Sequence, residues 1–101
     1  MKKTLGIYVT SDRHLDQLMQ LCKTAKKKGV AVKVFFTHEG TRLCTDPQME
    51  ALAGFVDVAL CKVGFADQKL NESNVALDGK AYSSQSWHAE MIYDCDRYLT
   101  F

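Results

Sequence analysis

Cysteine is the side chain in this sequence with the greatest capacity for covalent chemistry, and the 101-residue chain has four, at positions 22, 44, 61 and 95. They form no C-x-x-C pair and have no cysteine–histidine spacing typical of zinc sites. A chain that is 47% hydrophobic can build a core without cross-links, so a disulfide framework is not expected. The sequence therefore predicts free thiols in a reducing compartment, with no metal and no organic cofactor.

Cys61 has the setting that best favours reactivity. It ends the run VDVAL at 56–60, which is typical of a strand buried on both faces. A thiol at the end of such a strand can be stabilised as a thiolate by backbone N–H groups of the next segment and by a nearby cation such as Lys62. We predict that Cys61 is a nucleophile. The alternative is that Cys61 is the last packing residue of its strand.

The other three cysteines differ in their positions. Cys22 and Cys95 lie on apolar stripes at helical spacing, where a free cysteine behaves as a small hydrophobic residue, so we expect both in the core. Cys44 lies beyond the second expected strand, where it can either pack or assist Cys61. Pairing of Cys44 with Cys61 as a redox sensor is a further possibility.

The histidines and glycines narrow the chemistry further. His38 follows the second expected strand and can act as a proton partner for Cys61, or it is a solvated turn residue. His14 is expected at the surface, and His88 at the surface or at an interface. The segment 10–14, which follows the first strand, contains no glycine and so cannot form a phosphate-binding loop. A GxSxG hydrolase motif is also absent from the sequence.

The apolar pattern predicts one domain, residues 1–101, of alternating strands and helices. The expected strands are 3–9, 30–36, 56–61 and 97–101, with a short one near 75–77 or 81–82; the expected helices start at the caps Ser11 or Asp12, at Asp46-Pro47, and at 83. This order predicts an α/β fold: a three-layer α/β/α sandwich around a mostly parallel sheet of about five strands. Sites on such sheets lie beyond the carboxyl ends of the strands, where Cys61 and the segment 38–44 fall.

Composition limits the possible partners. The formal net charge is +1, which gives no electrostatic basis for nucleic-acid binding. The apolar runs are far shorter than the ~20 residues that cross a bilayer, and the start of the chain does not have the pattern of a signal peptide. We therefore expect a cytoplasmic protein without nucleic-acid or membrane partners.

Four stretches of the sequence carry a resemblance to a known family. LGIYVTSDRHLDQ, VKVFFTHEG, VALC and EMIYDCDRYLTF, in this order, resemble the DsrE/DsrF-like family and its TusD-type sulfur relay proteins. The resemblance covers essentially the whole chain. It implies a parallel α/β/α sandwich, assembly into trimers or hexamers, and a cysteine just after the third strand that carries sulfur as a persulfide. That cysteine corresponds to Cys61.

The expected function is that of a small sulfur carrier or sulfurtransferase. Cys61 accepts sulfane sulfur from a donor protein and passes it to the thiol of an acceptor protein, with Lys62, His38 and Cys44 as assisting residues. Asp67-Gln68-Lys69 differs from the arginine–glycine pair of active family members. The alternative is therefore a non-catalytic oligomeric binding or regulatory subunit in which Cys61 is structural.

Two expectations concern surfaces around this cysteine. The polar segment 62–80 is long for a connection in a small domain, and we expect it either to cover Cys61 as a movable segment or to be an ordinary solvated loop. Phe65 and Trp87 are large apolar residues outside the expected core stripes. We expect them at a contact between copies of the chain.

Overall fold

Runs of β-branched and aromatic residues form a five-stranded sheet in the computed structural model of the chain, which describes residues 3–54, 56–71, 75 and 81–101. The strands are β1 (Thr4–Val9), β2 (Ala31–Phe36), β3 (Asp57–Cys61), β4 (Tyr82–Ser83) and β5 (Arg97–Thr100). Their order is β4-β3-β2-β1-β5, and each neighbouring pair is parallel. The predicted α/β class, with about five mostly parallel strands, is confirmed.

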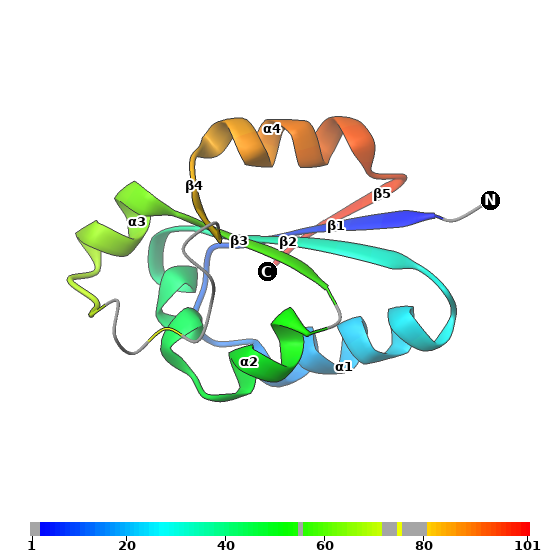
Figure 1. Cartoon of the computed structure of the whole chain (residues 1–101), viewed down its shortest axis with the longest axis horizontal. Helices are drawn as coiled ribbons and strands as arrows, with labels where there is room; N and C mark the ends of the chain where they lie inside the picture. Colours follow the sequence, from blue (N-terminus) through cyan, green and yellow to red (C-terminus); the bar gives the residue numbers. More distant parts are fainter. Residues whose placement is uncertain (1–2, 55, 72–74, 76–80) are drawn as a thin grey trace.

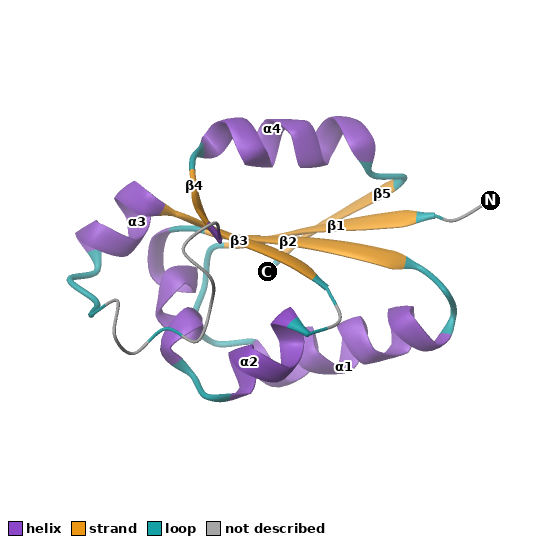
Figure 2. Cartoon of the chain, in the orientation of Figure 1, coloured by secondary structure: helices purple, strands orange, loops and turns teal. Residues whose placement is uncertain are grey.

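The helices that connect these strands lie on both sides of the sheet. They are α1 (Leu15–Lys27), α2 (Gln48–Ala53), α3 (Lys62–Asp67) and α4 (Gln85–Asp94), together with the 3-10 helix η1 (His38–Thr45). Figure 1 shows α1 and α2 on one side of the sheet and α4 on the other. Figure 2 shows α3 and η1 at the end of the sheet where β3 stops.

The larger part of the core lies under α1 and α2. The buried side chains of α1 pack there with those of α2 and with alternate residues of the strands; among them are Leu18, Cys22, Met49, Phe36 and Leu60. The short helix α2 begins at Gln48, with Pro47 as its N-cap rather than its first residue, and the Asp46 carboxylate accepts a hydrogen bond from the Gln48 N–H at 2.9 Å. Alternation along β3 sends Leu60 to this face and Cys61 to the opposite one.

The face under α4 is smaller and largely aromatic. Its buried cluster is Phe35, Ala59, Cys61 and Met91, with Tyr8 and Trp87 packed against it. His88, expected at the surface or at an interface, is partly buried, and its ring stacks on Tyr8 with centroids 3.9 Å apart. Its Nε2 lies 2.8 Å from the Tyr98 hydroxyl, and its Nδ1 lies 3.1 Å from Gln85 Oε1.

His88 therefore fastens α4 to β1 and β5. An amide oxygen only accepts hydrogen bonds, so Nδ1 donates to Gln85 and the neutral Nε2 accepts from Tyr98. Burial lowers the pKa of His88, which favours the same neutral state.

Several local expectations were wrong. Helix α1 begins at Leu15 without a side-chain cap; Ser11 instead accepts from the Arg13 N–H, and the Asp12 carboxylate lies 3.4 Å from the Arg42 guanidinium. The first part of the 62–80 segment is the helix α3. Its later residues 72–74 and 76–80 lie outside the described residues, so the movable-segment expectation there is not tested.

The expected exposure of two apolar residues was also reversed. Phe65 is only 4% exposed and meets Tyr82 edge-on with ring centroids 5.4 Å apart, so it is a core residue. Ile92, expected on the core face of α4, is 47% exposed. The cause is that α4 approaches the sheet through Trp87, His88 and Met91, which turns the neighbouring positions outward.

Gly40 fixes η1 against the end of β1. Its N–H lies 2.9 Å from the Thr37 carbonyl and 3.2 Å from the Thr10 carbonyl, and a Cβ at this position would overlap the Val9 carbonyl. We expect Gly40→Ala to lower the free energy of unfolding by about 2 kcal/mol, because the backbone must shift to admit the methyl group. Urea denaturation measures this. The neighbouring exposed variant Glu39→Ala is the control and should change stability by no more than ~0.5 kcal/mol; equal effects would contradict the packing argument.

Candidate functional site

Cys61 occupies two structural positions at once. It is the last residue of β3 and the N-cap of α3, and its Sγ accepts a hydrogen bond from the Gly64 N–H at 3.4 Å. A free N–H in the first turn of a helix needs an acceptor, which is here a sulfur rather than the usual oxygen. An amide that donates to sulfur also stabilises negative charge on it. The thiol is 7% exposed.

Gly64 lets the start of η1 approach the start of α3. A Cβ at Gly64 would lie 3.0 Å from the His38 backbone nitrogen and 3.4 Å from Thr37 Oγ1. His38 itself has a φ of 50°, a left-handed conformation that is rare for residues other than glycine. This turn carries the chain from the end of β2 to the neighbourhood of Cys61.

A pocket of about 520 Å³ opens beside the thiol. It lies where β2 and β3 end and where α3 and α4 begin. Its lining residues are Thr37, His38, Cys61, Lys62, Val63, Gly64, Asp67, Ser83, Ser84 and Gln85. The structure places Cys61, Lys62 and His38 around one pocket, with the Lys62 and His38 side chains exposed.

Cys44 does not line this pocket. It is fully buried in the core cluster under α1, whereas Cys61 belongs to the cluster under α4. Burial raises the pKa of the Cys44 thiol from its ordinary 9.0 to about 12. Cys44 is therefore a packed thiol held in its protonated form, and all four cysteines of the chain are free.

The remaining two cysteines differ from each other. Cys22 is buried as expected, and its burial raises the pKa of its thiol to about 11. Cys95 was expected in the core but is half-buried at the end of α4, where its Sγ lies 3.6 Å from the Ile92 carbonyl. Its sequence neighbours are Asp94, whose carboxylate lies 4.0 Å from the Lys33 ammonium, and Asp96, whose carboxylate accepts from the Thr4 N–H.

A hydrogen-bonded bridge supports the pocket from outside. The Arg42 guanidinium in η1 donates to Gln68 Oε1 at 2.8 Å and pairs with the Asp12 carboxylate. Gln68 follows α3 directly, so this bridge joins η1 to the end of α3. The contribution of these exposed groups to stability is small, but they favour one placement of the two helices.

Sequence reasoning missed the residues that α4 and β2 supply to the pocket. Ser84 is the N-cap of α4 and accepts from the Ser86 N–H at 3.2 Å; a Ser-Ser pair before a helical stripe is a recognisable cap signal. Thr37 follows β2 directly. Its place next to Cys61 depends on the order of the strands, which the sequence did not reveal.

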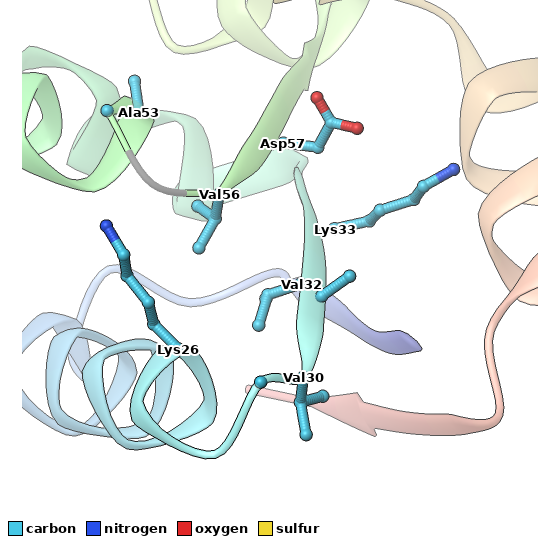
Figure 3. A pocket seen from close by; sticks show the side chains of 10 residues that line it. Lys26, Val30, Val32, Lys33, Ala53, Val56 and Asp57 are labelled. Atoms are coloured by element: carbon cyan, nitrogen blue, oxygen red, sulfur yellow. The ribbon is translucent and has the colours of Figure 1, made fainter. Parts of the chain in front are cut away.

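A second pocket, of about 400 Å³, lies at the opposite end of the sheet, where β2 and β3 begin. Figure 3 shows Lys26 on one side of it and Val30, Val32 and Val56 along its floor. The lining contains no cysteine, histidine or serine among the residues that the structure describes. The pocket beside Cys61 is therefore the better candidate for chemistry.

The described residues contain neither a metal centre nor a membrane-spanning helix. In the described part of the chain, no group of three or more metal-binding side chains is placed to hold an ion. Across the same residues, no helix has the length and apolarity to cross a membrane. No protein-family model matches the chain, and no curated protein matches it. The inferences below therefore depend on the geometry of the site and on the resemblance noted in the sequence.

The four thiols should separate by their reaction with iodoacetamide at pH 7. We expect Cys61 to react fastest, because its sulfur accepts from the Gly64 amide and the pocket gives access. Cys95 should react more slowly, because its thiol donates to the Ile92 carbonyl. Cys22 and Cys44 should stay unmodified until urea unfolds the chain. Peptide mass spectrometry over time measures each rate. Modification of Cys44 before Cys61 in the folded protein would show that the site is misassigned.

Proposed function

We propose that the protein is a sulfur carrier that accepts sulfane sulfur on Cys61 and passes it to a partner thiol. The observation that supports this proposal is the placement of Cys61, whose sulfur receives an amide hydrogen bond and opens on a pocket together with Lys62 and His38. A thiolate is the reactive species in sulfur exchange, and its rate depends on charge stabilisation and access.

The chemistry consists of two displacements. In the first, the Cys61 thiolate attacks the outer sulfur of a donor persulfide; a new S–S bond forms, the donor S–S bond breaks, and the donor leaves as a thiolate. In the second, an acceptor thiolate attacks the outer sulfur on Cys61 and releases the Cys61 thiolate. No electrons are gained or lost overall, so no cofactor is needed.

The assisting residues have separate roles in this proposal. Lys62 is the residue next to Cys61, and its ammonium group balances negative charge as it moves from sulfur to sulfur. His38 exchanges the proton that distinguishes a thiol from a thiolate. Cys44 performs no step, because its buried thiol stays protonated and lies outside the pocket lining.

The resemblance to the DsrE/DsrF-like family supports the same role. In this view the donor and acceptor are other proteins, and the carrier works in the cytoplasm. A non-catalytic subunit is the second candidate, because a thiol that is only 7% exposed also fits a packing role.

Sulfur loading distinguishes the two candidates. We expect exposure to polysulfide to add about 32 Da, one sulfur atom, to Cys61 in intact-protein mass spectrometry. Cys61→Ser should abolish this addition, whereas Cys95→Ser, which removes the other partly exposed thiol, should retain it. Dithiothreitol should remove the added mass, because a persulfide is reducible. A stable wild-type chain that gains no reducible sulfur would favour the non-catalytic subunit.

We also propose that the chain assembles into a homo-oligomer, a trimer or a hexamer. The large apolar side chains most exposed on α4 and β5 are Ile92, Tyr93, Tyr98 and Leu99, and Tyr93 is 90% exposed. Ile92 and Tyr93 belong to α4, and Tyr98 and Leu99 belong to β5, the terminal strand of the sheet. Large exposed apolar side chains commonly mark contacts between proteins.

Light scattering after gel filtration tests the oligomer. We expect a mass of three or six times the 11.4 kDa of one chain. Tyr93→Ser should reduce the assembled fraction, because it removes the most exposed of these side chains. Lys23→Ser, on the outer face of α1, is the control and should not change the mass. A wild-type monomer at tens of micromolar would contradict the proposal.

A further inference from the structure

Thr37 has an unusual polar environment beside Cys61. Two polar residues are buried in the described chain, Thr37 and Thr41. The Thr41 hydroxyl donates to the His38 carbonyl at 2.7 Å, whereas the hydrogen bonds of the described residues include none at the Thr37 hydroxyl. A hydroxyl with little access to water and no protein partner is disfavoured unless water or a ligand bonds to it.

The Thr37 oxygen opens on the pocket. Every fully buried side-chain oxygen among the described residues has a hydrogen-bond partner. The Thr37 oxygen has no such partner, so it is part of the 2% of Thr37 that is exposed. Thr37 lines the pocket, and its Oγ1 lies on the side of Gly64, where a Cβ would approach it to 3.4 Å. The hydroxyl is therefore placed to donate to a molecule that enters beside Cys61.

The opposite wall is the beginning of α4. Figure 1 shows this end of α4 at the same end of the sheet as α3. In α4, a helix of ten residues, the Ser84 side chain and carbonyl accept from the N–H groups of Ser86 and Trp87. Gln85 is the first residue of α4, so its N–H has no acceptor within the helix, and the described backbone hydrogen bonds give it none elsewhere. Helix beginnings of this length favour anions.

The positive and negative side chains that line the pocket lie at different ends of it. Lys62 lies beside Cys61, at the first residue of α3. Asp67, the carboxylate of the described lining, is the last residue of α3, roughly 7.5 Å from Lys62 along the helix axis at 1.5 Å per residue. The positive end of the pocket is thus the end that holds the thiol.

We propose that this pocket binds a small anionic sulfur donor, a low-molecular-weight hydropersulfide that carries a carboxylate. The inference rests on the proposed sulfur-carrier function and names its donor. The Cys61 thiolate attacks the outer sulfur, which keeps its proton; the new S–S bond forms as the donor S–S bond breaks, and its electron pair leaves on the donor thiolate. The Thr37 hydroxyl, the Gln85 N–H and Lys62 hold the carboxylate and the departing thiolate.

Alkylating reagents test the anion preference without any sulfur transfer. Iodoacetate and iodoacetamide differ chiefly in charge, so their rate ratio reports the local field at a thiol. The ratio for N-acetylcysteinamide, a free thiol without a local protein field, is the reference. We expect the iodoacetate-to-iodoacetamide ratio to be about fivefold higher at Cys61 than for this reference thiol at low salt. Equal ratios would overturn the anion site while leaving the carrier function standing.

Thr37→Val tests the hydroxyl with little change in shape. We expect it to slow loading of Cys61 from the hydropersulfide of mercaptopropionate about tenfold, the effect of one hydrogen bond to a charged group. Loading from the hydropersulfide of mercaptoethanol, which has no carboxylate, and the iodoacetamide rate should change by less than about twofold. Thr41→Val, which alters a buried threonine outside the pocket lining, is the matched control. It should leave the ratio of the two loading rates unchanged.

The outcomes separate the two proposals. One outcome is that the wild-type protein takes sulfur from neither donor but still shows the raised iodoacetate-to-iodoacetamide ratio. That outcome contradicts the carrier function and leaves the anion site standing. Protein that loads both donors at equal rates, with or without Thr37, contradicts the small anionic donor and points to a protein donor instead.

Discussion

The parallel direction of all five strands is the constraint on which the candidate site depends. Parallel strands end at the same edge of a sheet, so the residues that follow them become neighbours whatever their separation in sequence. The register aligns Phe36 with Leu60 and Cys61 with Ser83. Thr37, one residue after β2, therefore lies beside Cys61, and Ser84, one residue after β4, lies on the other side. The pocket is a direct result of this alignment.

The two faces of the sheet are packed with different kinds of side chain. Under α1 and α2, aliphatic side chains and two buried cysteines form an ordinary core. Under α4, flat rings stack on one another: Trp87 on Phe35, and His88 on both Phe35 and Tyr8. Stacked rings with hydrogen bonds at their edges hold a helix in one orientation more strictly than aliphatic contacts do. This orientation places the beginning of α4 at the pocket.

The sequence predicted the elements better than it predicted the site. Apolar runs at 4–9, 31–36 and 57–61 identified three strands, because burial on both faces leaves a continuous signal. Helix α3 was missed because Val63 and Gly64 are poor helix formers; the sulfur cap and the burial of Phe65 compensate. Cys61 was identified from its strand-end position. Thr37 was not, since its importance comes from a neighbour distant in the chain.

The capping bond between Gly64 and Cys61 links the chemical state of the sulfur to the backbone. When Sγ carries a second sulfur atom, negative charge moves to the outer atom, and the inner one becomes a poorer acceptor for the amide. The first turn of α3 then loses part of its cap, an interaction that contributes about 1 kcal/mol in ordinary helices. A loaded and an empty protein would differ in the local order of α3, which gives a partner a surface by which to tell one from the other.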